Sequence, residues 1–378
     1  MNTPQLRFKE FTNKWDTKDL KTILKVNSGR DYKHLNTGDI PVYGTGGYML
    51  SVNRSLSEED AIGIGRKGSI DKPQKLKAPF WTVDTLFFCT SKNETDLDFL
   101  FVLFNKINWK KYDESTGVPS LSKNTIENIS IYVPSINEQQ KMGEFFNTLD
   151  SKIQLHQEKV ELLKAQKKGI MQKIFSQELR FKDEAGEDYP EWKTYKLVEL
   201  VAFFKGQALS KNDLAAEGVP CVLYGQLYTI YGEIIDKVIS KTQNNRGFNG
   251  EIGDVLIPSS GETALDIACA SALKENALLG GDLNVLRPNK NLVNGNFLAY
   301  LLSNGYKNEL FKLAQGATVV HLYNNSLKSL SINLPIIEEQ QKIANTLICL
   351  DKKIKKETRK VSEIAIQKQA FMQQMFVN

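Results

Sequence analysis

The 378-residue sequence is poor in the side chains that build metal sites and disulfide frameworks. It contains three histidines and four cysteines, Cys89, Cys221, Cys269 and Cys349, and the cysteines are isolated from one another. Zinc sites and disulfide-rich domains are recognised by closely spaced cysteines or histidines. We therefore expect free thiols in a reducing compartment and no metal ion bound by this chain.

Long apolar runs are also missing. No stretch approaches the roughly 20 consecutive apolar residues that a transmembrane helix needs. The N-terminal stretch MNTPQLRFKEF lacks the apolar core of an export signal. These absences predict a cytoplasmic protein with no membrane contact.

The motifs of nucleotide and cofactor chemistry are absent or out of context. The sequence has no [DN]-P-P-[YF] stretch to hold a flipped adenine and no G-x-x-x-x-G-K-[ST] phosphate loop. Residues 63–68, GIGRKG, match the dinucleotide fingerprint formally, but Pro73 and Pro79 follow them where the fingerprint requires a helix. The sequence therefore predicts that this chain binds no cofactor.

The net charge of +5 is small and unevenly placed. Residues 137–176 contribute +2 and residues 338–375 contribute +3, so the rest of the chain is neutral in sum. A chain-wide basic surface for nucleic acid is thus excluded. Any DNA contact must come from local patches or from the charge of a partner.

One long internal repeat organises the chain. VPSINEQQKMGEFFNTLDSKI at 133–153 recurs as LPIIEEQQKIANTLICLDKKI at 334–354, an offset of 201 residues. At the same offset IMQKIF at 170–175 matches FMQQMF at 371–376, and LRFKEFTNKW near the N-terminus is echoed by LRFKDEAGEDYPEW after the first copy. The sequence is a tandem duplication in which each unit is a globular half followed by a helix.

Both helical segments have a coiled-coil pattern. Apolar residues recur at alternating intervals of four and three, and the mean period of 3.5 residues is typical of a coiled-coil seam. Two unrelated surface helices would share this phase only by chance. The predicted seam positions are Met142, Phe146, Leu149, Ile153, His156, Val160 and Leu163 in the first segment, and Ile343, Leu347, Leu350, Ile354, Glu357, Val361 and Ile364 in the second.

Four polar residues interrupt this predicted seam, namely His156, Lys167, Glu357 and Lys368. A polar residue at a seam position usually fixes register and orientation at some cost in stability. His156 and Glu357 are equivalent under the 201-residue offset, so antiparallel pairing of the helices would bring them near each other. The alternative is that both side chains reach solvent or face the helices of a partner.

The cyclic order of half, helix, half, helix favours an antiparallel helix pair. Each globular half has short strand patterns broken by glycine turns and one helical stretch, at 97–112 and 295–314. The predicted fold class is α+β, with two mixed α/β domains joined by two long helices in an antiparallel, pseudo-twofold symmetric coiled coil. The predicted boundaries are 1–136 and 179–337 for the domains, and 137–178 and 338–378 for the helical regions.

Several motifs resemble the specificity subunit of type I restriction–modification systems. In the first half these are IPVYGTGGY, IGRKGSI, FWTVDT and STGVPSLSKNTIENISIYVP, which leads into the first copy of the repeat. In the second half AQGATVVHLYNNSLKSLSINLP leads into the second copy. The resemblance covers essentially the whole chain. One departure is that the second half has SSGETALD near the place of GRKG.

The resemblance implies a chain without catalytic activity. Such a subunit reads a two-part sequence in double-stranded DNA through two target recognition domains. Its partners would be methyltransferase (modification) subunits, expected to number two, and restriction/translocase subunits. The methyltransferase partner uses S-adenosylmethionine, whereas this chain binds no cofactor itself.

Under this resemblance, polar and aromatic residues of both halves are candidates for DNA contact. The glycines of GIGRKG would let a tight loop expose backbone amides and place Arg66 and Lys67 close to a guanine edge or a phosphate. The alternatives are an exposed turn with solvated cations and, for the tyrosines, positions in the core. The candidates are Thr45, Tyr48, Arg66, Lys67, Ser69 and Lys72 in the first half, and Tyr224, Gln226, Tyr228, Lys241, Asn245 and Arg246 in the second.

Two other functions were weighed against DNA recognition. A coiled-coil scaffold whose globular halves bind protein is favoured by the neutral charge of those halves. A single-chain restriction enzyme is disfavoured because the catalytic motifs are missing.

Overall fold

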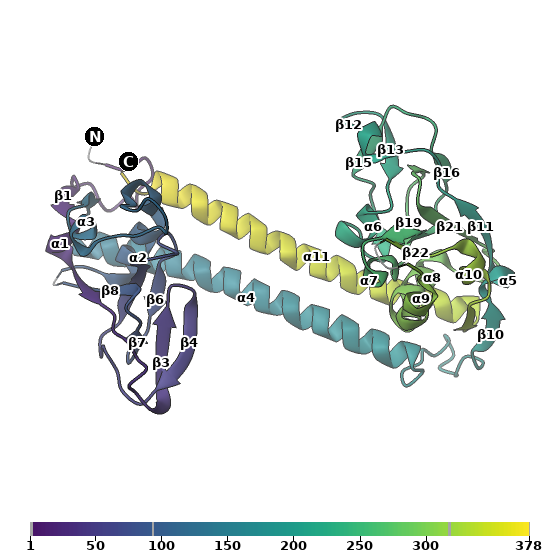
Figure 1. The fold of residues 1–378 in the computed structure, drawn as a ribbon, viewed down its shortest axis with the longest axis horizontal. Coiled ribbons are helices and arrows are strands. Elements are labelled where there is room, and N and C mark those ends of the chain that lie inside the picture. The colour runs from purple at the N-terminus through teal and green to yellow at the C-terminus, as the bar shows by residue number, and fades with distance from the viewer. Residues whose placement is uncertain (1–2, 93, 317–318, 378) are drawn as a thin grey trace. The chain divides into compact units, whose positions relative to one another are not determined.

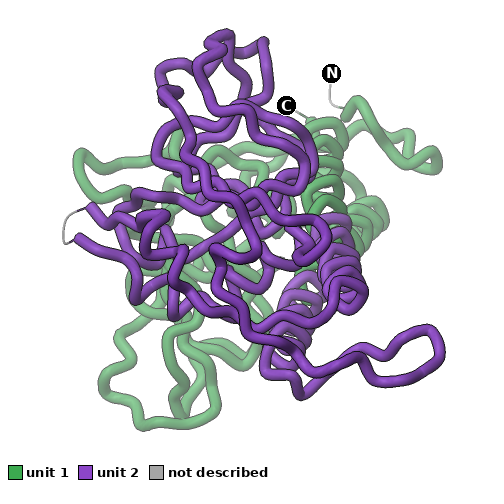
Figure 2. Tube along the Cα trace, turned by 90° about the vertical axis from the view of Figure 1, so that its right-hand side faces the viewer, with its two compact units in different colours: residues 1–158, 357–378 green, residues 159–356 purple. Residues whose placement is uncertain are grey.

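The computed structural model describes residues 3–92, 94–316 and 319–377. The chain forms two compact units, coloured separately in Figure 2. Unit 1 comprises Met1–Glu158 and Glu357–Asn378, and unit 2 comprises Lys159–Lys356.

Each unit contains one α+β domain and one end of each of two long helices, α4 (Ile136–Phe175) and α11 (Ile337–Gln374). The predicted fold class, two mixed domains joined by two long helices, is confirmed. The four cysteines are unpaired, as expected.

The domain of unit 1 is built on a four-stranded sheet of order β2-β8-β5-β6 and a three-stranded sheet of order β4-β3-β7 (Figure 1). The helix predicted at 97–112 forms as α2, where the Asp96 side chain caps the first turn by accepting from the amide of Phe99 at 2.7 Å. The elements are β1 (Asp16–Asp19), α1 (Leu20–Ile23), β2 (Leu24–Ser28), β3 (Thr37–Gly44), β4 (Gly47–Val52), β5 (Ala61–Gly65), β6 (Gln74–Leu76), β7 (Trp81–Thr82), β8 (Leu86–Ser91), α2 (Leu97–Lys106), a 3-10 turn (Trp109–Tyr112), α3 (Lys123–Glu127) and β9 (Ser130–Val133).

The domain of unit 2 contains two five-stranded sheets, of orders β11-β21-β17-β19-β14 and β12-β15-β13-β20-β16. The helical stretch predicted at 295–314 forms as α8, a π-helical turn (Leu301–Gly305) and α9. The elements are β10 (Lys193–Lys196), α5 (Leu197–Leu200), β11 (Val201–Lys205), a 3-10 turn (Lys211–Asp213), β12 (Leu214–Ala215), β13 (Val219–Val222), α6 (Gln226–Thr229), β14 (Ile234–Ile235), β15 (Ser240–Thr242), β16 (Phe248–Gly250), β17 (Val255–Pro258), β18 (Ser260–Gly261), α7 (Ala264–Ile267), β19 (Ser271–Leu273), β20 (Ala277–Leu279), β21 (Leu283–Pro288), α8 (Gly295–Tyr300), α9 (Lys307–Leu313), β22 (Val320–His321), α10 (Asn324–Lys328) and β23 (Ser331–Leu334).

The repeated NEQQ and EEQQ motifs fasten each long helix to its own domain. In unit 1 the buried carboxylate of Glu138 accepts two hydrogen bonds from Arg7, each of 2.7 Å. The buried Gln139 side chain accepts from the amide of Asp96 and donates to the carbonyl of Pro134. Since a buried polar group must find partners, these contacts give the motif a structural reason.

Unit 2 makes corresponding contacts. Glu339, Gln340 and Pro335 lie at the 201-residue offset, whereas their partners Arg180 and Asn294 lie at other spacings from Arg7 and Asp96. The carboxylate of Glu339 accepts from Arg180, with the shorter contact at 2.8 Å. Gln340 accepts from the amide of Asn294 and donates to the carbonyl of Pro335. The short sheets β1–β9 and β10–β23 correspond as well. The duplication therefore repeats the hydrogen bonds that attach each long helix to its own domain.

Within unit 1 the two helices run antiparallel. Phe146 packs against Phe376, which follows α11, with ring centroids 6.2 Å apart, whereas Asp150, one turn further along α4, pairs with Lys368, which lies earlier in α11. His156, further still along α4, contacts Glu357, which lies earlier again in α11. Numbers that rise along α4 fall along α11, which is the signature of antiparallel pairing.

The burial of side chains follows the predicted seam. Every predicted seam residue is buried or half-buried. Between Ser151 and Gln166 of α4, the only side chains that are not exposed are Ile153, His156, Val160 and Leu163. The 3.5-residue period of the sequence is thus the period of contact between the helices.

Candidate nucleic-acid interface

The first-half candidates come together in one region of unit 1. The hairpin β3–β4 carries Thr45 at its turn, and the loop after β5 carries Arg66 and Lys67. Gln74 fixes the turn by donating its side-chain amide to the carbonyls of Gly44 and Thr45, at 3.0 and 3.3 Å. A Cβ atom placed on Gly68 would lie 3.9 Å from Oγ1 of Thr45, so the hairpin turn and the loop are neighbours.

The turn of the hairpin presents an aromatic side chain to solvent. Tyr48 is 63% exposed and its hydroxyl is hydrogen-bonded to that of Ser51 at 3.2 Å. Gly47 has a φ of +109°, a conformation that requires glycine, so the tight turn depends on it. Met49 beside it is 49% exposed, and sequence reasoning missed it. The alternation of side chains along a strand does not hold beside this turn, so it does not predict that both Tyr48 and Met49 are exposed.

The expectation that GIGRKG exposes its backbone amides is wrong. Residues 61–65 form the buried strand β5. The amides of Arg66 and Lys67 both donate to the carbonyl of Thr85, at 2.8 and 3.3 Å, and that of Gly68 donates to the carbonyl of Pro119 at 2.8 Å. These amides are satisfied inside the domain, so they do not face a ligand. Only the side chains of this loop remain available to a ligand.

Those side chains are available. Arg66, Lys67 and Lys72 are exposed, and within the described residues their side chains form no hydrogen bond or ion pair. The guanidinium carbon of Arg66 lies 5.9 Å from the ring centroid of Phe87. Ser69 is half-buried.

Three of the six second-half candidates, Tyr224, Gln226 and Tyr228, line a cleft of about 970 Å³ in unit 2, whereas Lys241, Asn245 and Arg246 are not part of its lining. Tyr224 and Tyr228 line it with their ring centroids 6.5 Å apart. Burial raises the pKa of Tyr228, so its hydroxyl stays protonated and is able to donate a hydrogen bond. Tyrosines in such a cleft offer both a stacking face and a polar tip.

Gln226 has a different place from the one expected of a base reader. Its Oε1 accepts from the amide of Leu223 at 2.9 Å and its Nε2 donates to Oγ of Ser240 at 2.5 Å. With both ends of its amide engaged and only 9% of the residue exposed, Gln226 shapes the wall of the cleft.

Lys241, Asn245 and Arg246 are exposed on β15 and the loop that follows it. The cleft also includes Lys211, Glu262 and Asp282 (a residue with a φ of +59°), which sequence reasoning missed. These residues belong to three separated segments, and no local pattern unites them.

The structure reveals which residues of unit 2 correspond to GRKG. Ser259 donates its amide to the carbonyl of Asp282 at 2.8 Å and accepts from the amide of Leu322 at 3.0 Å. Arg66 makes the same two bonds in unit 1, to Thr85 at 2.8 Å and from Leu121 at 2.9 Å. Arg66-Lys67-Gly68 is therefore equivalent to Ser259-Ser260-Gly261. The two domains therefore share the backbone hydrogen bonds at this place but carry different side chains there.

Each of the four polar residues of the predicted seam has a partner on the other long helix. Nδ1 of His156 lies 2.7 Å from Oε2 of Glu357, so the predicted approach of these two residues is confirmed. Lys368 pairs with Asp150 in unit 1, and Lys167 pairs with Asp351 in unit 2. Lys167 is equivalent to Lys368, and Asp150 to Asp351, under the 201-residue offset. The same lysine–aspartate pair therefore occurs once in each unit.

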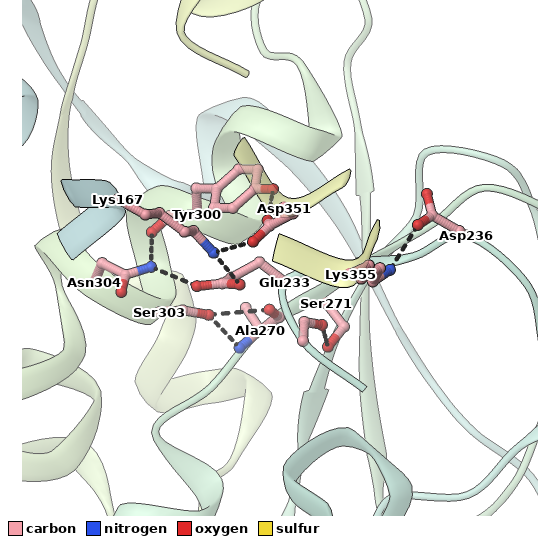
Figure 3. A network of polar contacts seen from close by, with 11 residues as sticks. Lys167, Glu233, Asp236, Ala270, Ser271, Tyr300, Ser303, Asn304, Asp351 and Lys355 are labelled. Carbon is pink, nitrogen blue, oxygen red and sulfur yellow. Dashed lines mark hydrogen bonds and ion pairs between the residues drawn. The ribbon is translucent and has the colours of Figure 1, made fainter. Parts of the chain in front are cut away.

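The Lys167 pair belongs to a larger network in unit 2, drawn in Figure 3. Nζ of Lys167 lies 2.8 Å from Asp351 and 3.1 Å from Glu233, and 5.1 Å from the ring centroid of Tyr300. The Tyr300 hydroxyl donates to Asp351, and Asn304 donates to Glu233. The network ties α4 and α11 to the domain of unit 2.

Charges within this network are stabilised by their neighbours. Burial opposes ionisation of Glu233, but Lys167 and the hydrogen bond from Asn304 outweigh it and lower the pKa of Glu233. Burial and the adjacent Asp351 raise the pKa of Tyr300 well above its usual value. At neutral pH the network therefore holds a carboxylate at Glu233 and a neutral tyrosine at Tyr300.

Across the described ranges, no group of three or more His, Cys, Asp and Glu side chains is arranged to hold a metal ion. In the same ranges, no helix combines the length and apolar character of a membrane span.

Comparison with known proteins identifies the family and the fold of this chain. The fold defines a duplicated α+β protein with two domains on paired helices. The family model for the type I restriction modification DNA specificity domain matches residues 12–165 and 189–365, and the chain belongs to this family.

Two curated relatives come from Methanocaldococcus jannaschii. The chain is 26% identical over 279 residues to the type I restriction enzyme MjaVIII specificity subunit, covering 70% of this chain and 65% of that protein. It is 25% identical over 311 residues to the putative MjaX specificity subunit, covering 77% and 69%. The matched region thus spans about two thirds of these relatives.

Solved structures share the fold. The crystal structure of a type I restriction-modification system S subunit from M. genitalium has a TM-score of 0.71 and 16% identity, covering 100% of this chain and 99% of that one. A chain from a study of complex assembly and conformational transition of the type I R-M system has a TM-score of 0.54 and 16% identity, covering 95% and 96%.

Proposed function

We propose that the chain is the non-catalytic DNA-recognition subunit of a type I restriction–modification complex. Residues 1–136 and 179–337 each read one half of a bipartite target in double-stranded DNA. The observation that carries this proposal is the equivalence of Arg66-Lys67 and Ser259-Ser260 on one backbone frame. Duplicated domains that carry different side chains at equivalent backbone positions are suited to reading two different sequences.

Specific side chains support the two readings. In the first domain Thr45, Tyr48, Arg66 and Lys67 are gathered at the hairpin turn and the loop after β5. In the second, Tyr224 and Tyr228 line the 970 Å³ cleft. The remaining candidates are the half-buried Ser69 and the exposed Lys72 in the first domain, and the exposed Lys241, Asn245 and Arg246 in the second.

The long helices are proposed to dock the methyltransferase subunits. Leu155, Leu162 and Ile366 are 63%, 59% and 67% exposed on the faces of α4 and α11 that point away from the seam. Leu155 and Leu162 are one heptad apart and therefore share a face. Exposed apolar residues in such an arrangement favour packing against partner helices. We propose two methyltransferase subunits, which use S-adenosylmethionine, together with restriction/translocase subunits, in the cytoplasm.

Selection of DNA from a random duplex library tests the function. The purified chain, assembled with its methyltransferase subunit, should enrich duplexes with two short conserved blocks separated by an unread gap. The methyltransferase subunit alone is the control and should enrich none. A protein-binding scaffold, the other candidate favoured by the neutral globular halves, predicts no enrichment.

The non-catalytic role has its own test. The purified chain alone, incubated with S-adenosylmethionine and the selected duplex, should transfer no methyl group. Methylation that persists after rigorous removal of the partner would refute this part of the proposal.

A further inference from the structure

Three cations of the first domain converge on one cleft. This cleft, of about 370 Å³, is lined by Arg66, Lys67 and Lys123, with the serines Ser28 and Ser120 also in its wall. Lys123 is the first residue of α3, so it reaches the cleft from a different segment than Arg66 and Lys67. The prediction from sequence did not include it.

Only one acidic residue lines the same cleft. The carboxylate of Glu114 accepts hydrogen bonds from the hydroxyls of Thr125 and Ser122, and these bonds lower its pKa. Glu114 is therefore ionised and committed to partners on α3. Lys123 has an exposed i,i+4 contact of 3.5 Å with Glu127, which is a weak interaction in water. The cleft lining holds three positive charges against one negative charge.

We propose that this cleft, the Arg66–Lys67–Lys123 cleft, binds a phosphate group of the DNA backbone. The proposal rests on the proposed function and names the part of DNA that this region contacts. Phosphates protrude from the duplex and carry its charge, whereas base edges lie at the floor of the grooves. A concave site with several converging cations and hydroxyl donors suits a phosphate, and a single projecting side chain suits a base edge.

The second domain lacks this site at the equivalent positions. Arg66 and Lys67 correspond to Ser259 and Ser260, as the shared backbone hydrogen bonds show. Lys123 corresponds to Asn324, the first residue of α10, at the 201-residue offset. All three cations are replaced by neutral residues. The phosphate contact at this place is therefore a property of the first domain alone.

The variant Arg66→Ser/Lys67→Ser/Lys123→Asn installs the residues of the second domain and tests the proposal. Its complex with the methyltransferase subunit is titrated with the selected duplex and with a scrambled duplex over a salt series. We expect both affinities to fall by a similar factor, roughly tenfold, and the slope of log K against log salt to become shallower by about one. The matched control, Lys9→Ser/Lys14→Ser/Lys18→Asn, removes the same charge elsewhere in the domain and should leave the slope nearly unchanged.

A charge-preserving variant separates phosphate binding from base reading. Arg66→Lys keeps the cation but loses the guanidinium fork that a guanine edge requires. A phosphate site predicts nearly parental affinity and unchanged base preference. Relaxed preference at one base position, with the salt slope retained, would overturn the proposal in favour of base readout.

Two results distinguish the cleft from the function as a whole. If the parent complex selects a bipartite sequence but the triple variant binds both duplexes as the parent does, the cleft makes no DNA contact and this inference fails. If the parent complex shows no sequence selection at all, the proposed function itself fails. Unchanged assembly with the methyltransferase subunit and an unchanged far-UV spectrum establish that the triple variant is folded.

Discussion

The two units share their joints and differ in their clefts. In both, an arginine holds a buried glutamate at the start of a long helix, through Arg7–Glu138 and Arg180–Glu339. At the equivalent place, however, unit 1 has the exposed Arg66 and Lys67, whereas unit 2 has the half-buried Ser259 and the buried Ser260. Duplication has kept the parts that attach a domain to the helices and has varied the side chains at this place. This division suits the proposed reading of two different half-sites.

The coil shows the same contrast between a shared interaction and different surroundings. Lys167 and Lys368 are equivalent in the repeat and each pairs with an aspartate. The Lys167 side chain is 11% exposed and contacts Glu233 and Tyr300 as well, whereas Lys368 is 20% exposed and its partner Asp150 is 38% exposed. Unit 2 is therefore fixed to its helices by a larger polar network.

Replacing each of these two lysines with methionine should give the largest difference in stability loss between the two units. Lys167→Met leaves Glu233 and Asp351 without their cation in a mostly buried site, which typically costs about 3–5 kcal/mol. Lys368→Met removes a more exposed pair, worth about 0.2–1 kcal/mol. Hydrogen exchange of amides in α8 for the first variant and in α2 for the second measures the free energy of local opening. Equal losses in the two variants would contradict the difference in burial.

The pH dependence of Lys167→Met sharpens this comparison. The pKa of Glu233 is lowered in the folded protein, so its contribution is present above its unfolded pKa and is lost as the pH falls through the folded value. Without Lys167 this lowering disappears. We therefore expect the stability gap between parent and variant to be largest near pH 7 and to narrow below about pH 4.5, near the ordinary value for glutamate. Urea denaturation at several pH values measures it, and a constant gap would exclude the ion pair as its cause.

A smaller change in stability is expected at the His156–Glu357 pair. These two residues are equivalent to each other under the 201-residue offset. Replacing both residues with Leu should stabilise the coil by about 1–4 kcal/mol, because apolar residues in a seam avoid the cost of desolvating a polar pair. His156→Leu alone should destabilise it, since Glu357, only 6% exposed, loses a partner. Thermal unfolding of both variants compares them with the parent. A double variant less stable than the parent would contradict placement in the seam.

Local periodicity explains what could be predicted from the sequence. The seam is a pattern of neighbouring residues and the 201-residue offset is a direct match of two segments, so both can be read from the sequence. The offset and antiparallel pairing of the helices together predict the contact of His156 with Glu357. The loop after β5 was different, because its amides are occupied by carbonyls of Thr85 and Pro119, far along the chain. The side-chain amide of Gln226 on α6 is likewise engaged by a residue of a separate element, Ser240 on β15. Contacts between distant segments decided both cases, and one sequence does not encode them as a visible pattern.

Exchange of a single domain tests the central account most directly. Residues 1–136 are replaced by the corresponding segment of a related specificity subunit, and the chimaera, assembled with its methyltransferase subunit, selects from a random duplex library. The account predicts that one block of the bipartite target changes while the other block remains that of the parent. A change in both blocks, or in neither, would contradict two independent readers on a shared frame.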